Sequence, residues 1–240
     1  MLFRFIKYFI VILLSLTLSL TAALAVETDA TLLLFEDQDS QDEPPYLSRM
    51  LLTNDYLRMD DGKDDGDFAL YDRKTGTIYS ISHEDQRTLV IPLQAVDSAP
   101  DKPLRHDFEN LGSSDLPTID GRKVSRYYLF TNGRRCMEVY AVPGLYEDAV
   151  KAMAGFAKTL AGQHAKTMRF IPDDVSNDCD LANNIFVPDR HLSKGFPVRQ
   201  KDFTGRRRSL VSVKENVKVD SSMFELPMGY EKFMPGAITN

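Results

Sequence analysis

The sequence has few residues of the kinds that build catalytic and metal sites. It contains two cysteines and four histidines, and His83, His106, His164 and His191 stand singly along the chain. None of the patterns G-x-S-x-G, H-E-x-x-H, G-x-x-x-x-G-K-[ST] and G-x-G-x-x-G occurs. These absences exclude the commonest hydrolase, zinc-protease and nucleotide sites. The sequence therefore predicts a protein that is not an enzyme and holds no cofactor or metal.

Long apolar runs are also scarce, and the one at the N-terminus is shorter than the roughly 20 residues that span a bilayer. Arg4 and Lys7 precede this run, and Ala23-Leu24-Ala25 follows it with the small residues that a signal peptidase accepts. The pattern predicts a cleavable signal peptide over residues 1–25, with cleavage after Ala25. No cysteine lies near that site, which excludes lipid attachment there. The alternative is a retained membrane anchor.

Basic residues are too few for a nucleic-acid partner. The chain has 29 Lys and Arg against 35 Asp and Glu, and subtracting the two basic residues of the predicted signal peptide leaves 27 against 35. An acidic surface repels phosphate groups and favours solubility. The remaining residues, 26–240, suit one domain that does not span a membrane and is exported to the periplasm or secreted.

Cys136 and Cys179 predict one disulfide bond, because two thiols in an exported domain usually pair. A metal site needs more ligands, and a redox pair normally has C-x-x-C spacing. The predicted bond joins a strand to the polar loop over 172–184.

Short β-rich segments separated by turn residues predict an antiparallel sheet. Residues 121–130 and 134–142 form a hairpin around Asn132-Gly133, because Asn-Gly suits a type I′ turn. Residues 97–120 predict irregular chain or a weak edge strand. The other expected strands are Thr31–Phe35, two strands within Tyr46–Asp60, Phe68–Tyr71, Thr77–Ile81, Thr88–Ile91, Phe196–Phe203, Ser209–Val219 and Met223–Leu226.

Over residues 145–168 the spacing of the apolar residues changes to that of a helix. Apolar residues recur there at intervals of three and four, which predicts one long amphipathic helix packed on the sheet. Gly155 and Gly162 lower its intrinsic propensity, so packing must stabilise it. The expected apolar face consists of Tyr146, Ala149, Val150, Met153, Phe156, Ala157, Leu160 and Ala161.

Two charged segments suggest ligand-binding sites, and each also has a simpler interpretation as solvated surface. The acidic turn over 60–67 has carboxylates for calcium, but Lys63 occupies a ligand position of the EF-hand pattern and no helices flank it. A solvated hairpin turn is the favoured interpretation. Arg206-Arg207-Arg208 offers cations for lipid phosphates, although a short basic run at a strand connection is usually solvated surface.

Two segments resemble exported bacterial proteins of the LolA, LolB and RseB superfamily, which is related to outer-membrane lipoprotein sorting. The first is DYLRMDDG followed by ALYDRKTGTIYSISHEDQRTLVI, and the second is GFPVRQKDF with LVSVKENVKVDSSMFELPMGY. The resemblance implies an α+β fold in which a strongly curved antiparallel sheet, a half-open barrel, carries a long helix on its concave face. Members use this hollow for acyl chains or for protein binding. The single long helix and the two cysteines depart from the lipoprotein carrier.

The resulting functional prediction is an exported, non-enzymatic envelope protein that binds an apolar or lipid-like ligand, such as a lipoprotein acyl chain, between sheet and helix. The alternative is a protein-interaction or sensor module with a filled core and an envelope protein partner. An open cavity of roughly 300 Å³ or more favours the first. The expected ligand lining is Leu57, Met59, Leu70, Ile78, Tyr128, Val139, Met153, Phe156 and Leu160.

Overall fold

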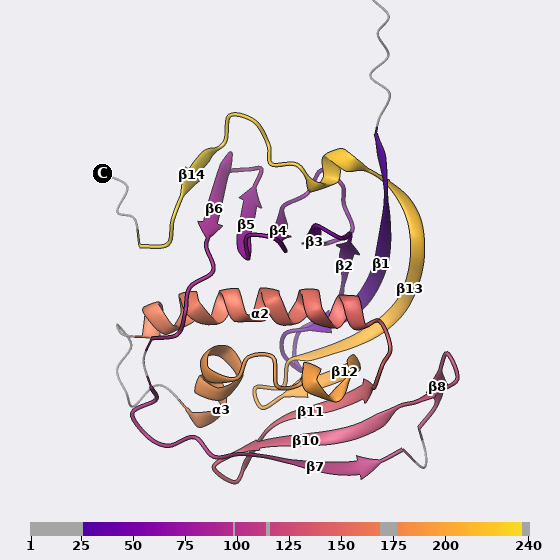
Figure 1. The fold of residues 1–240 in the computed structure, drawn as a ribbon, viewed down its shortest axis with the longest axis vertical. Helices are drawn as coiled ribbons and strands as arrows, with labels where there is room; N and C mark the ends of the chain where they lie inside the picture. The colour runs from indigo at the N-terminus through magenta and orange to yellow at the C-terminus, as the bar shows by residue number, and fades with distance from the viewer. Residues whose placement is uncertain (1–25, 98, 114–115, 169–176, 237–240) are drawn as a thin grey trace, which may run out of the picture.

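The computed structural model describes residues 26–97, 99–113, 116–168 and 177–236, so the predicted signal peptide lies outside the described residues. Twelve strands form one mixed sheet in the order β14-β6-β5-β4-β3-β2-β1-β13-β12-β11-β10-β7. Strands β8 (Thr118–Ile119) and β9 (Arg122–Lys123) pair separately. Figure 1 shows helix α2 (Glu147–Met168) between strands β1–β6 on one side and β7 and β10–β12 on the other.

The first half of the sheet is the antiparallel meander that the sequence predicts. Each of these strands pairs with the next in the chain, because turns rich in Asp, Gly and Asn separate them. The strands are β1 (Glu27–Gln38), β2 (Tyr46–Leu52), β3 (Tyr56–Asp60), β4 (Phe68–Asp72), β5 (Thr77–Ser82) and β6 (Arg87–Ile91). Strand β14 (Glu231–Phe233) adds to β6 in parallel.

The second half consists of β7 (His106–Gly112), β10 (Ser125–Thr131), β11 (Arg134–Val142), β12 (Phe196–Asp202) and β13 (Arg207–Asp220). The predicted β10–β11 hairpin is present, and both turn residues, Asn132 (φ 51°) and Gly133 (φ 77°), have the positive φ of a type I′ turn. Every residue of β7 is exposed, in agreement with the predicted weak edge strand.

The predicted fold class, an α+β half-open barrel with a helix on its concave face, is wrong. The described residues are mostly β, and twelve of their strands form one open mixed sheet whose edges, β7 and β14, do not pair with each other. Instead, the long strand β13 pairs with β1 from Glu27↔Asp220 to Gln38↔Arg207 and joins the two halves of the sheet.

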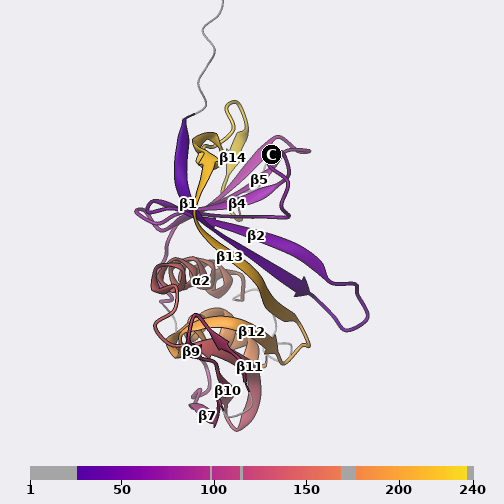
Figure 2. The same cartoon turned by 90° about the vertical axis from the view of Figure 1, so that its right-hand side faces the viewer.

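Most of the apolar face predicted for the helix packs against the core, but its residues are buried to different degrees. The buried residues of α2 are Ala149, Ala152, Thr159, Ala161, Gly162 and Ala165, whereas the large side chains Met153, Phe156 and Leu160 are only partly buried. The buried hydroxyl of Thr159 donates to the carbonyl of Gly76, 2.8 Å away, in the β4–β5 turn. Figure 2 shows the helix end-on beside the strands. Small residues therefore bring the helix axis close to the sheet.

Gly162 shows how close that approach is, and it gives a first testable prediction. A Cβ atom at position 162 would collide with the backbone carbonyl oxygen of Gln94, which has little freedom to move. We expect Gly162→Ala to lower the free energy of unfolding by about 1–3 kcal/mol in urea titrations, as overpacking does. Helix propensity alone predicts a gain of up to about 1 kcal/mol, and observing that gain would contradict the close contact. Lys166→Ala, at an exposed position of the same helix, is the control.

The β1–β6 half of the sheet is buried on both faces. One face contacts α2 through a core that includes Leu33, Phe35 and Phe196, all 0% exposed. The other face packs against the chain after β13, where Phe224 is buried. A strand predicted over Met223–Leu226 is wrong, because a 3₁₀ helix, η3 (Ser221–Phe224), occurs there and the side chain of Asp220 caps it.

The predicted disulfide between Cys136 and Cys179 is confirmed, with both cysteines fully buried. It attaches the short helices α3 (Asp178–Leu181) and η1 (Ala182–Phe186) to β11. The bond indicates an oxidising compartment. Within the described part of the chain, no helix has both the length and the apolar character needed to cross a membrane.

Candidate functional site

A cavity of about 430 Å³ lies between α2 and the inner face of the sheet, and it opens to solvent. Its apolar wall combines side chains from both layers. Because α2 buries its small residues against the sheet, its larger side chains flank this contact and face the cavity. On α2 and strands β2, β3 and β11 the apolar lining residues are Met50, Leu57, Met59, Met137, Met153, Phe156, Ala157 and Leu160, and Leu192 and Phe203 add apolar surface from other segments.

The other end of the cavity is polar, and ion pairs between neighbouring strands order it. Arg208 on β13 pairs across the ladder with Asp37 on β1, and its Nε and Nη2 atoms donate to the two carboxylate oxygens at 2.7 and 2.9 Å. Arg206 approaches Asp39 at 3.2 Å. Two of the three consecutive arginines are therefore paired with carboxylates.

The segment after the disulfide forms the remaining wall. Asp180, Asn183 and Asn184 line the cavity. Arg190 anchors this segment through Nε and Nη2, which donate to the side-chain oxygen of Asn183 at 3.1 and 2.7 Å. His191 also lines the cavity, and burial lowers its pKa to about 4. The imidazole is neutral at pH 7 and brings no charge to the site.

Five of the nine predicted ligand-lining residues lie in this wall: Leu57, Met59, Met153, Phe156 and Leu160. The other four, Leu70, Ile78, Tyr128 and Val139, do not line this cavity. Ile78 and Val139 are buried in packed cores, and Leu70 faces the opposite side of the sheet. Tyr128 contacts Arg126 and Arg135 on β10 and β11. Three other hollows, of about 730, 820 and 610 Å³, contain none of the nine.

The sequence interpretation missed the polar half of the cavity. Met50 was detectable from its place in the alternating pattern of β2, but Gln200, Asp202 and Asp37 carry no local signal. They meet because β1, β13 and β12 are neighbours in the sheet, with Asp37 opposite Arg208 and Arg208 opposite Gln200. That register joins residues more than 160 positions apart.

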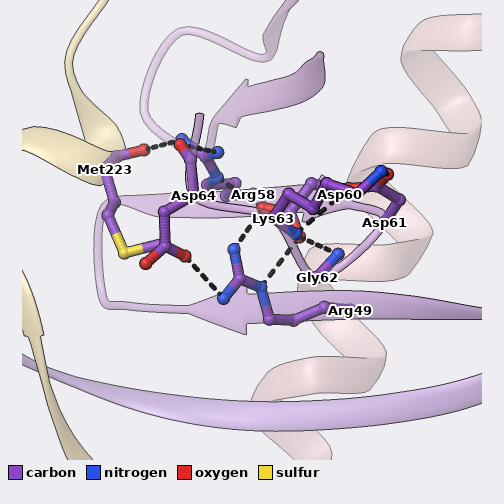
Figure 3. Close-up of polar contacts among 8 residues, drawn as sticks. All are labelled: Arg49, Arg58, Asp60, Asp61, Gly62, Lys63, Asp64 and Met223. Carbon is purple, nitrogen blue, oxygen red and sulfur yellow. Dashed lines mark hydrogen bonds and ion pairs between the residues drawn. The ribbon is translucent and has the colours of Figure 1, made fainter. Parts of the chain in front are cut away.

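The acidic turn is exposed from Asp61 to Asp65, as predicted, but its first residue, Asp60, belongs to a buried ion cluster, drawn in Figure 3. The carboxylate of Asp60 accepts from Arg49 Nε (2.8 Å), Arg58 Nε (2.6 Å) and the Gly62 amide (2.9 Å). Burial alone would raise the pKa of Asp60, but these hydrogen bonds outweigh it and lower the pKa. Arg58 is only 2% exposed, and it also donates to the carbonyl of Met223.

This cluster is a structural contact rather than a calcium site. The carboxylates of Asp60, Asp61 and Asp64 pair with Arg49, Arg58 or Lys63 instead of facing one centre. Among the residues that the structure describes, no group of three or more His, Cys, Asp or Glu side chains is arranged to hold a metal ion. The cluster fastens the chain after β13 to the outer face of the sheet.

No family model and no curated protein matches this chain. Among solved structures, it is similar to an uncharacterized conserved protein from Thermus thermophilus, at 10% identity and a TM-score of 0.44 over 88% of this chain and 91% of that one. It is also similar to PNGF-II in a C2 crystal form, at 10% identity and a TM-score of 0.43. The match covers 88% of this chain but only about a third (32%) of that chain. Similarity this low carries no information about function, and the resemblance to the LolA superfamily stays a hypothesis.

Proposed function

We propose that this chain is an exported, non-enzymatic binding protein that holds an apolar or lipid-like ligand between α2 and the sheet. We further propose that residues 1–25 are its signal peptide and that it acts in the periplasm or outside the cell. The observation that carries this proposal is the 430 Å³ cavity, to which both α2 and the sheet contribute apolar side chains. This volume lies in the range of small-molecule sites.

The polarity of the cavity also favours an elongated amphiphile. Most of its apolar wall is built from α2, β2, β3 and β11, while its charged residues come from β1, β12, β13, the connections after β1 and between β12 and β13, and the α3–η1 segment. An apolar chain in the first region removes hydrocarbon from water, and a polar head in the second stays hydrogen-bonded. The four methionines of the wall adapt to chains of different shape.

Phe156→Ala tests whether the wall binds a ligand. The ring of Phe156 is partly buried and meets Tyr71 edge-on at 6.0 Å between centroids. Because one side of the ring faces open space, we expect a loss of unfolding free energy below about 3 kcal/mol. Affinity for the uncharged fluorescent probe N-phenyl-1-naphthylamine should fall, since the probe loses an aromatic contact in the cavity.

Phe196→Ala is the matched control, because Phe196 is fully buried in the core. Phe196→Ala should lower the free energy of unfolding by about 3–5 kcal/mol, the usual value for such a truncation. Equal losses for the two variants, together with no probe binding by the wild-type protein, would reject the ligand-binding proposal. Native mass spectrometry of protein purified from its own envelope would identify a bound lipid directly.

A second candidate function, protein interaction, is favoured by β7. This strand forms one edge of the sheet, all seven of its residues are exposed, and Phe108 is 52% exposed. An exposed edge offers unpaired backbone groups to an extended segment of another protein. An envelope protein partner remains the alternative if the cavity binds no probe.

A further inference from the structure

One face of β10, β11 and β12 carries interleaved basic and aromatic side chains. Directly paired residues of antiparallel neighbours lie on the same face, and two rows of such pairs cross the three strands: Arg126, Tyr140 and Arg199, then Tyr128, Glu138 and Lys201. The opposite face packs in a separate core that includes Tyr127 and Val139, and Met137 on that face lines the cavity. Figure 1 shows α2 and α3 on this cavity side of the strands. None of the six residues in the two rows lines the cavity, so the rows face away from it.

The guanidinium groups on this face lie over the tyrosine rings. Arg126 is 5.0 Å from the ring centroid of Tyr128 and 5.5 Å from that of Tyr140. Arg135 is 4.5 Å from the Tyr128 centroid, and Arg199 is 5.6 Å from the Tyr140 centroid. All four distances are within the reach of a cation–π contact. The rings therefore hold the guanidinium planes in place, and a ligand that binds them immobilises less side-chain motion.

The charge of this face is positive, although the whole chain has more acidic than basic residues. Within β10, β11 and β12, all of which the structure describes, the basic side chains on this face are Arg126, Arg135, Arg199 and Lys201, which we call the basic strip. The one acidic side chain is Glu138, and Arg126 Nε donates to it at 2.7 Å. The other three members of the strip have no carboxylate within ion-pair distance among the described residues. Such an unbalanced cluster attracts anionic partners.

Acidic residues border the basic strip on both sides. On β7, Asp107 and Glu109 lie opposite the β10 residues of the same face. On β1, Glu36 lies opposite Ser209, which in turn lies opposite Arg199. A flat anionic bilayer would meet these acids as well as the cations, whereas a single extended chain along β11 and β12 would meet mainly the cations. The charge pattern therefore favours a narrow anionic partner.

The spacing and the residue types of the strip fit a peptide. Arg199 and Lys201 are two positions apart on β12, which separates them by roughly 7 Å, the same period as alternate side chains of an extended peptide. Guanidinium forks accept carboxylates in a bidentate geometry. Arg and Tyr are also the residue types that contribute most to protein–protein interfaces.

We propose that the basic strip docks an extended acidic segment of another protein, with Asp or Glu at alternate positions facing Arg135, Arg199 and Lys201. Because the strip lies on the face opposite the cavity, this interaction does not depend on the proposed ligand-binding function. It also differs from pairing at the β7 edge, since it uses side chains and leaves the backbone groups of the sheet paired with each other.

Fluorescence anisotropy of a labelled peptide of alternating Glu and Thr, titrated with residues 26–240 at low salt, tests the proposal. We expect saturable binding that weakens as salt rises. Replacing Arg135 and Arg199 together with alanine should weaken it by about tenfold. A peptide of the same composition with Glu and Thr in two blocks turns half of its carboxylates away, so it should bind about threefold more weakly.

Two further variants separate the site from general charge. Lys151→Ala with Lys166→Ala removes the same charge from exposed positions of α2, and its affinity should stay within about twofold of wild type. Arg135→Lys with Arg199→Lys keeps the charge but loses the planar forks, so its affinity should fall between those of wild type and the alanine variant. The alanine variant should bind N-phenyl-1-naphthylamine like wild type, which also shows that it is folded.

No binding of the alternating peptide by wild type would overturn the proposal, and so would equal losses in the alanine variants of the strip and of α2. Vesicles of phosphatidylglycerol test the remaining source of negative charge. If they bind at lower concentration than the peptide, and if the loss of Arg135 and Arg199 abolishes that binding, the strip docks on an anionic membrane and the protein partner is rejected. Each of these outcomes leaves the ligand-binding proposal as it stands.

Discussion

Asp60→Asn should lower the free energy of unfolding at pH 7 by roughly 3–5 kcal/mol, the usual cost of removing one partner from a buried ion pair. The amide has the shape of the carboxylate but lacks its charge. It leaves the buried guanidinium of Arg58 beside Arg49 without the anion that both now share. Urea titration of residues 26–240, followed by circular dichroism, measures the difference.

The dependence of the unfolding free energy on pH below 7 tests whether the lost charge causes this effect. The pKa of Asp60 is lowered in the folded protein, so its stabilising contribution is complete above the unfolded value of about 3.9 and is lost as the pH falls through the folded value. Wild type and Asp60→Asn should therefore become more similar in stability below about pH 4. Asp61→Asn, whose partner Lys63 is exposed, should show little change at any pH. A constant difference between wild type and Asp60→Asn from about pH 7 to about pH 2.5 would point to lost packing instead of lost charge.

Replacing Cys136 and Cys179 with alanine should cost roughly 4 kcal/mol, the chain-entropy estimate for a cross-link of 43 residues. Alanine suits both positions because they are fully buried. Urea titrations of the double variant and of the oxidised wild type measure this loss. Arg190 still ties Asn183 to the carbonyl of Phe130, so the variant should retain a folded sheet.

The same double variant should also bind N-phenyl-1-naphthylamine more weakly. The disulfide positions the segment that contributes Asp180, Asn183 and Asn184 to the cavity, and a loosened wall must be ordered again on binding. Wild type reduced with dithiothreitol under native conditions should behave like the variant. A fully reduced protein with unchanged stability and unchanged affinity would show that the cross-link has no part in shaping the site.

Local patterns were enough to predict much of the strand content and one turn type. The β10–β11 turn was predictable because few residues accept the two positive φ angles, and Asn132-Gly133 supplies them. The degree to which each residue of α2 is buried was not predictable, because the sequence pattern cannot show that a carbonyl of Gln94 and the ring of Tyr71 approach Gly162 and Gly155. The helix therefore turns its small residues inward and leaves Phe156 beside open space.

The sequence by itself determined the features that depend on residues close together in the chain, namely the antiparallel meander and the β10–β11 hairpin. It also determined the disulfide, because the chain has only two cysteines to pair. The tertiary structure decided which strands border one another across the whole chain. The pairing of β1 with β13 joins the two halves of one open sheet, and together with the β12–β13 pairing it brings Asp37, Arg208 and Gln200 to one wall. No local preference encodes such a register, because it depends on how the whole sheet buries its apolar faces on both sides.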